Sequence, residues 1–134
     1  MKKIFLSHRF TGEDLIELTE TLGKITAVLR AKGHEVYCSV EDELWFREHK
    51  RTNREIMEHA LRKLDDSDVV LAFIRSPEKS EGMLLEIGYA VAKGKPFILA
   101  LKQGLKTMAI AEMADPLIEF ESSEDLCGKL NAIF

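Results

Sequence analysis

Five short apolar runs, each separated from the next by a segment with helical spacing, constrain the fold of this chain more than any other feature. The clearest are Asp68–Ser76 (DVVLAFIRS) and Pro96–Lys102 (PFILALK). Such near-continuous apolar runs are typical of strands that are buried on both faces. We expect further strands at Lys2–Ser7, at His34–Val40 and, more exposed, at Pro116–Ser122.

The segments between these runs predict helices. Six aliphatic residues recur at helical spacing after the first strand, and Gly33 ends that segment as a C-cap: Leu15, Leu18, Leu22, Ile25, Val28 and Leu29. Residues 53–68 predict a helix with Asn53 as N-cap. Residues 41–52 predict a loop or short helix, residues 105–114 a short helix, and residues 123–134 a closing helix capped by Ser122 or Ser123.

Strands that alternate with helices predict an α/β fold with right-handed crossovers and a parallel sheet covered on both faces. We expect a flavodoxin-like doubly wound five-stranded parallel sheet in the order 2-1-3-4-5, as a single domain over residues 1–134. Such sheets bind ligands where the strand order reverses, beyond the carboxyl ends of the strands. The loops at that point are Ser7–Asp14 and Arg75–Gly82.

Composition excludes several classes of function. The net charge of −4 gives no basic surface for nucleic acid, although a small phosphorylated ligand needs only a local site. Cys38 and Cys127 are too few for a disulfide framework or a zinc site, so we expect no metal and no cofactor. The first residues, MKKIFLSHRF, indicate neither a signal peptide nor a membrane anchor, and we expect a cytoplasmic protein.

Glu86 is the one charged residue between Met83 and Ala92 in the stretch SEGMLLEIGYAVAKGKP. A carboxylate buried in an apolar helix must be paired or functional. The alternative is a solvated glutamate that shares a helical stripe with Tyr89 and Lys93. The helix also begins with small residues at Ser80 and Gly82, and a helix N-terminus is suited to an anion.

Other proteins with this predicted architecture carry marks that the chain lacks. A receiver domain needs acidic residues after the first strand and an aspartate after the third, where this chain has Ser7-His8 and Arg75-Ser76. A flavodoxin phosphate loop is disfavoured by Glu13 and Asp14, and no G-x-G-x-x-G follows the first strand.

The stretch from Ser67-Asp68 through Gly82-x-x-x-Glu86-Ile-Gly-x-Ala to Gly94-Lys-Pro resembles the nucleoside 2-deoxyribosyltransferase superfamily, which includes 2′-deoxynucleoside 5′-phosphate N-hydrolases. The resemblance is specific over about residues 65–101. It implies that Glu86 is a nucleophile at C1′ of a nucleoside and that Asp68 helps to position the sugar. It implies that Ser80 and Gly82 hold a 5′-phosphate, and that Thr107 reaches that phosphate across a dimer interface.

The chain departs from the family pattern in its first strand and loop. Phe5 stands where many members have a tyrosine, which leaves ribose and deoxyribose both open as the sugar. Ser7, His8 and Arg9 lie at the predicted mouth of the site, where Arg9 could bind a phosphate and His8 could protonate a leaving base. Trp45 and Phe46 are candidates for a lid over the base.

We therefore expect an N-glycosidase that acts on nucleoside 5′-monophosphates and forms a homodimer or higher homo-oligomer. Three alternatives remain open at this point. They are a nucleoside 2-deoxyribosyltransferase, a TIR-like NAD hydrolase suggested by IFLSHRFTGED, and a catalytically inactive nucleotide-binding module.

Overall fold

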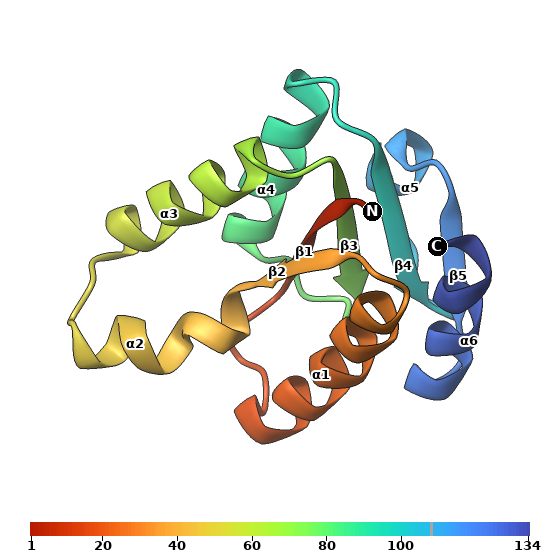
Figure 1. Cartoon of the computed structure of the whole chain (residues 1–134), viewed down its shortest axis with the longest axis horizontal. Helices are drawn as coiled ribbons and strands as arrows, with labels where there is room; N and C mark the ends of the chain where they lie inside the picture. The colour runs from red at the N-terminus through yellow and green to blue at the C-terminus, as the bar shows by residue number, and fades with distance from the viewer. Residues whose placement is uncertain (108) are drawn as a thin grey trace.

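The computed structural model describes residues 1–107 and 109–134, and its centre is a five-stranded sheet in the order β2-β1-β3-β4-β5 (Figure 1). All neighbouring strands run parallel. This order confirms the predicted flavodoxin-like doubly wound sheet. The strands are β1 (Lys3–His8), β2 (Glu35–Cys38), β3 (Val69–Ile74), β4 (Phe97–Lys102) and β5 (Leu117–Phe120).

Helices cover both faces of the sheet, as right-handed crossovers between parallel strands require (Figure 1). One face packs against the first and last helices, and the other against the helices from the middle of the chain. The helices are α1 (Leu15–Ala31), the 3-10 helix η1 (Ser39–Asp42), α2 (Glu43–Glu48), α3 (Asn53–Asp65), α4 (Glu81–Ala92), α5 (Ala109–Met113) and α6 (Ser123–Ile133). Met108, which belongs to the predicted short helix, lies outside the described residues.

The alternation of side chains along β1 assigns its residues to opposite faces of the sheet. Ile4 and Leu6 join the core under α1 and α6, whereas Phe5 joins the core under α3 and α4. By the same alternation, Ser7 faces α3 and α4 and His8 faces α1. This division decides which of the predicted site residues can meet.

Capping residues explain where the helices begin. The N-cap of α3 is Thr52 and not the predicted Asn53, because Thr52 and Glu55 form a reciprocal capping box that Asn53 cannot make from inside the first turn. Ser80 caps α4 and Ser122 caps α6, each by accepting a backbone N–H three residues on. Gly33 has a φ of 88°, which fits its predicted place at the end of α1.

Helix α4 is not buried on all sides, contrary to the impression that its apolar sequence gives. Met83, Ile87 and Ala90 pack on the sheet, but Leu84 and Leu85 are 39% and 60% exposed. The helix therefore presents an apolar face to solvent as well as one to the core.

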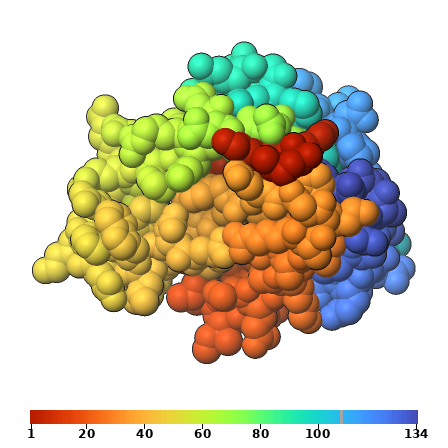
Figure 2. All heavy atoms as spheres, in the orientation of Figure 1, coloured from red at the N-terminus to blue at the C-terminus, as the bar shows by residue number. Residues whose placement is uncertain are grey.

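The segment of η1, α2 and the start of α3 projects beyond β2 at one side of the molecule, as Figures 1 and 2 show in yellow and orange. Phe46 is buried against the body, whereas Trp45 is 47% exposed. Within the described residues, no helix is long and apolar enough to cross a membrane, and no group of three potential ligands could hold a metal ion.

Candidate active site

Glu86 lies on the second turn of α4, and its side chain reaches the end of β1. The Ser7 hydroxyl donates a hydrogen bond of 2.7 Å to Glu86 Oε1. Burial raises the pKa of the Glu86 carboxyl from 4.5 to about 7, and the bond from Ser7 opposes part of that rise. The carboxylate that stood out in the sequence is therefore paired with a residue of the predicted site loop, 79 positions away in the chain.

Aromatic residues surround the same face of the sheet beside this pair. Phe5 is fully buried, and its ring lies 5.4 Å from the ring of Tyr37 on β2. The Tyr37 ring in turn lies 5.9 Å from the imidazole of His59 on α3, which pairs with Asp42 at 3.6 Å. The surface beside Glu86 is thus formed by the Phe5 and Tyr37 rings, and the polar pair of Asp42 and His59 lies next to Tyr37.

Sequence reasoning missed Tyr37 as a neighbour of Glu86, and it missed Asp42 and His59 as neighbours of Tyr37. Tyr37 had a usable signal, because alternation within EVYC places it on the opposite face from Val36 and Cys38, which pack under α1. Asp42 and His59 had none, since their positions depend on how α2 and α3 fold back over β2.

A cleft of about 490 Å³ opens beyond β3 at the carboxyl edge of the sheet, the place that the strand order predicts for a ligand. Its walls come from the loops after β1, β3 and β4 and from the first turn of α4. They include Arg9, Glu13, Arg75, Ser80, Met83 and Thr107. Ser7 and Glu86 do not line the cleft but lie next to lining residues: Ser7 is two positions before Arg9 at the end of β1, and Glu86 is one turn after Met83 on α4.

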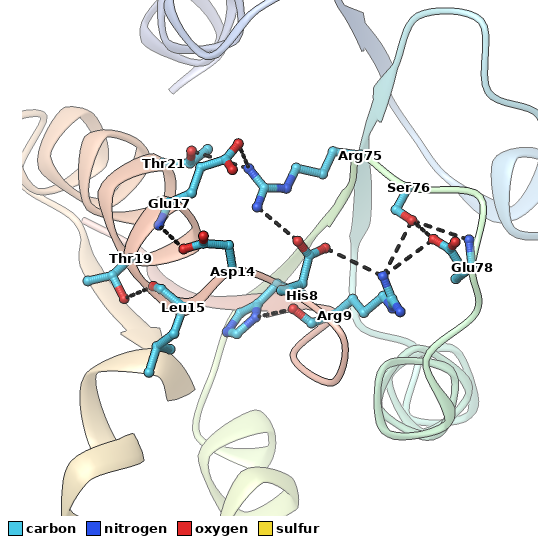
Figure 3. Close-up of polar contacts among 11 residues, drawn as sticks. His8, Arg9, Asp14, Leu15, Glu17, Thr19, Thr21, Arg75, Ser76 and Glu78 are labelled. Atoms are coloured by element: carbon cyan, nitrogen blue, oxygen red, sulfur yellow. Dashed lines mark hydrogen bonds and ion pairs between the residues drawn. The ribbon is translucent and has the colours of Figure 1, made fainter.

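Two arginines line this cleft, Arg9 just after β1 and Arg75 just after β3 (Figure 3). Both pair with Glu13, at 2.9 Å for Arg75 and 3.8 Å for Arg9, and the Glu13 side chain is only 11% exposed. Arg9 also pairs with Glu78 at 3.4 Å. Two guanidinium groups thus flank one inner carboxylate, while Glu78 is 63% exposed and also accepts a hydrogen bond from Ser76 Oγ.

Gly12 permits this position of Arg9. Its φ is 83°, and a Cβ at this residue would lie 2.5 Å from Arg9 Nη2.

Sequence reasoning did not name Arg75 as a site residue. Its position directly after β3, at the switch point of the sheet, was the signal that could have found it.

The N-terminus of α4 forms another wall of the cleft. Ser80 Oγ accepts the Met83 N–H at 3.2 Å, which leaves the other free N–H groups of the first turn for an anion. If Gly82 carried a Cβ, that atom would contact only Met57 Sδ, at 3.9 Å, which is an ordinary van der Waals distance. Packing within the protein therefore does not require glycine at this position.

Three predicted site residues do not join Glu86. Asp68 precedes β3 at the amino edge of the sheet, where it accepts the Lys3 N–H at 2.8 Å. The six residues of β3 separate it from the carboxyl edge by about 20 Å. His8 is buried on the α1 face, where its ring contacts Ser39 Oγ and the Arg9 carbonyl, and desolvation lowers its pKa. Thr107 lines the cleft of its own chain and accepts the Ala111 N–H at 3.0 Å.

Comparison with known proteins establishes the family. The model for nucleoside 2-deoxyribosyltransferases matches residues 10–124. The chain belongs to the nucleoside 2-deoxyribosyltransferase family. A relative from Thermofilum pendens, provisionally named 2′-deoxynucleoside 5′-phosphate N-hydrolase 1, is 34% identical over 109 residues, which cover 80% of this chain and 73% of the relative.

Two solved structures share the fold of this family member over nearly its whole length. A CMP N-glycosidase of Clostridium botulinum, BcmB, matches with a TM-score of 0.76 and 20% identity, covering 99% of this chain and all of that one. A 2-deoxyribosyltransferase of Bacillus psychrosaccharolyticus matches with a TM-score of 0.70 and 22% identity, covering 92% and 89%. At these identities the structures show a common fold. Hydrolases and transferases of nucleosides and nucleotides both occur among these relatives.

Proposed function

We propose that this member of the family is an N-glycosidase that hydrolyses nucleoside 5′-monophosphates, with Glu86 as its nucleophile. The observation that carries the proposal is the Glu86–Ser7 pair, a half-buried carboxylate held at the carboxyl edge of the sheet. It lies beside a cleft that contains two arginines and a helix N-terminus. A nucleophile and an anion site are thereby next to each other.

In the proposed reaction, a carboxylate oxygen of Glu86 forms a bond to C1′ of the sugar while the bond from C1′ to the base nitrogen breaks. The electron pair of that bond leaves with the base, which takes a proton from the medium. Water then attacks C1′, the bond from C1′ to the Glu86 oxygen breaks and restores the carboxylate, and the water gives up one proton to the medium. The negative charge of Glu86 stabilises the oxocarbenium character that develops at C1′ in both steps.

The Ser7 hydrogen bond has a defined role in this scheme. The nucleophile must be ionised, but burial favours the neutral acid and places the pKa of Glu86 at about 7. The Ser7 hydroxyl donates to the carboxylate, and this stabilises the charged form. We infer that Ser7 keeps part of the carboxylate ionised near neutral pH.

The cleft favours a phosphorylated substrate and so a hydrolase over a transferase of free nucleosides. Arg9 reaches the cleft beside the N-terminus of α4, and we infer that a phosphate can displace its exposed partner Glu78. We propose that Arg9, Ser80 and the first N–H groups of α4 bind the 5′-phosphate. The low crowding at Gly82 leaves room for a phosphate oxygen against the backbone.

We also propose that the chain forms a homodimer through the outer face of α4. Leu84, Leu85 and Val91 are 39%, 60% and 36% exposed on that face. A contiguous exposed apolar stripe on a helix is typical of an association surface. Because Leu84 also lines the cleft, a partner subunit on this face would lie at the edge of the site.

Base release from a substrate panel tests the function. The wild type, Glu86→Ala and the control Glu20→Ala, an exposed glutamate on α1, are incubated with three groups of substrates. These are ribo- and deoxyribonucleoside monophosphates, free deoxynucleosides with a second base, and NAD. Free base is measured by chromatography.

We expect release from monophosphates by the wild type and the control, and none by Glu86→Ala. Base exchange on free nucleosides would instead make the chain a transferase, and release of nicotinamide would support a TIR-like activity. Cleavage of none of these substrates would contradict the proposed enzyme and favour a binding module.

A further inference from the structure

Tyr37 carries a buried hydroxyl that nothing in the protein satisfies. Among the described residues, two buried side-chain polar atoms have no hydrogen-bond partner, the Tyr37 hydroxyl oxygen and His34 Nε2. His34 lies just before β2, at the edge of the sheet opposite the cleft. Tyr37 lies on β2 directly beside Phe5 of β1, on the face that holds Glu86.

An unsatisfied hydroxyl of this kind is costly in a folded protein, and native structures contain few of them. Two possible acceptors for the Tyr37 hydroxyl, the carboxylates of Asp42 and Glu86, lie in its surroundings. Burial of the ring raises the pKa of the Tyr37 hydroxyl, and the nearby carboxylates of Asp42 and Glu86 raise it further, so the hydroxyl keeps its proton and can donate it in a hydrogen bond. Asp42 approaches the hydroxyl closely enough to raise its pKa, but no acceptor of the described residues lies within hydrogen-bond distance and geometry of it, so the hydroxyl has a bond left to make.

The Tyr37 ring is packed between other rings, whereas the residue nearest to its hydroxyl is partly exposed. The Tyr37 ring packs between Phe5 and His59, at 5.4 Å and 5.9 Å between ring centres. Asp42 lies beside the hydroxyl and pairs loosely with His59 at 3.6 Å. The Asp42 side chain is 40% exposed, so the group nearest to the hydroxyl is itself in contact with solvent.

We propose that Tyr37 is a substrate-binding residue whose hydroxyl donates a hydrogen bond to an oxygen of the sugar held against Glu86. The sugar is the part of the substrate in question because Glu86 must approach C1′ to form a bond. This proposal rests on the proposed function for the identity of the ligand. It adds a polar contact from β2 to a site that otherwise draws on β1, α4 and the loops around the cleft.

Tyr37→Phe tests the proposal, and Tyr89→Phe is its matched control because these are the two tyrosines of the chain. The Tyr89 hydroxyl donates to Asp65 at 2.7 Å near the C-terminal end of α4, so it is satisfied within the protein. Ribose 5-phosphate and 2-deoxyribose 5-phosphate serve as probes because they contain the sugar and phosphate without any particular base. Affinity is measured by calorimetry, and the melting temperature is measured without ligand.

For Tyr37→Phe we expect affinity for at least one sugar phosphate to fall about tenfold, the loss of one hydrogen bond, or roughly 1.4 kcal/mol. The melting temperature without ligand stays the same or rises, because the variant removes an unsatisfied buried group. For Tyr89→Phe the affinity stays within twofold of wild type and the melting temperature does not rise.

A structural role for Tyr37 would give the opposite pattern, a lower melting temperature and unchanged affinity, and would overturn the proposal. Failure of wild type to bind either sugar phosphate would overturn it as well. Failure of the proposed function is a separate result: no base release from the substrate panel by wild type, whatever Tyr37→Phe does to sugar phosphate binding. The two proposals can thus fail independently.

Discussion

Glu86→Gln is expected to make the protein more stable, and the gain is expected to depend on pH. The substitution keeps the shape of the side chain and an oxygen that can accept from Ser7, but it removes the carboxyl group that titrates. In the folded protein burial raises the pKa of that group from 4.5 to about 7. Between those values the folded state holds a proton that the unfolded chain has lost.

The sign follows from proton linkage. Because the folded state binds more protons than the unfolded state in this window, the contribution of Glu86 to stability falls as pH rises from 4.5 to about 7. At about 1.4 kcal/mol per pH unit, the full penalty above pH 7 is about 3 kcal/mol. Most of it develops between pH 5 and pH 8, so the advantage of Glu86→Gln over wild type should grow by about 2–3 kcal/mol over that range.

Urea unfolding of both proteins at pH 5 and pH 8 measures this quantity. The difference between variant and wild type at each pH cancels the titration of every other group, including His8. Glu20→Gln, which removes an exposed carboxylate from α1, should show a difference that changes by less than about 0.5 kcal/mol across the same range. An advantage of Glu86→Gln that is the same at both pH values, or that shrinks as pH rises, would refute the burial and raised pKa of Glu86.

Three further predictions concern the neighbours of Glu86 and the framework of the site. Ser7→Ala removes the hydrogen bond that lowers the pKa of Glu86. The acidic limb of the pH–rate profile should therefore move up by about one pH unit, while the rate at pH 9 should be nearly unchanged. A uniform loss of rate at all pH values would contradict this. Arg9→Gln should raise KM for monophosphates by about tenfold to a hundredfold and leave free nucleosides unaffected, as steady-state kinetics on both substrates would show. Thr52→Ala removes the side-chain acceptor of the Glu55 N–H at the start of α3 and should lower the free energy of unfolding by about 1 kcal/mol, whereas Asn53→Ala, one position inside the helix, should lower it by less.

The sheet could be predicted because its strands are buried on both faces. Runs such as VVLAFI of β3 and FILALK of β4 have no other ready interpretation at their length, and the alternation with helical segments leaves few topologies. The first and last residues of the helices and strands were harder to predict. Thr52 rather than Asn53 caps α3 because the capping box depends on the reciprocal bond from Glu55.

The candidate site was predictable where it depends on topology and not where it depends on packing. The strand order alone places Ser7, Arg9 and Ser80 at one edge of the sheet, and Glu86 stood out as a charge within an apolar helix. Asp68 could be assigned to a strand boundary but not to the site, because a residue before a strand lies at the opposite edge from the cleft. Tyr37 and His59 come together only through the way α3 crosses β2, which no local pattern encodes.

The central claim is that Glu86 forms a covalent bond to the sugar, and mass spectrometry of the acid-quenched reaction tests it most directly. The wild type is mixed with a monophosphate that it cleaves, and the reaction is quenched with acid within the first turnovers. The protein is then digested, and the mass of the peptide that contains Glu86 is measured. We predict a fraction of that peptide heavier by one sugar phosphate residue, with none in Glu86→Gln, which should also release no base. Release of base at the wild-type rate by Glu86→Gln, or a sugar adduct on a peptide without Glu86, would contradict the account.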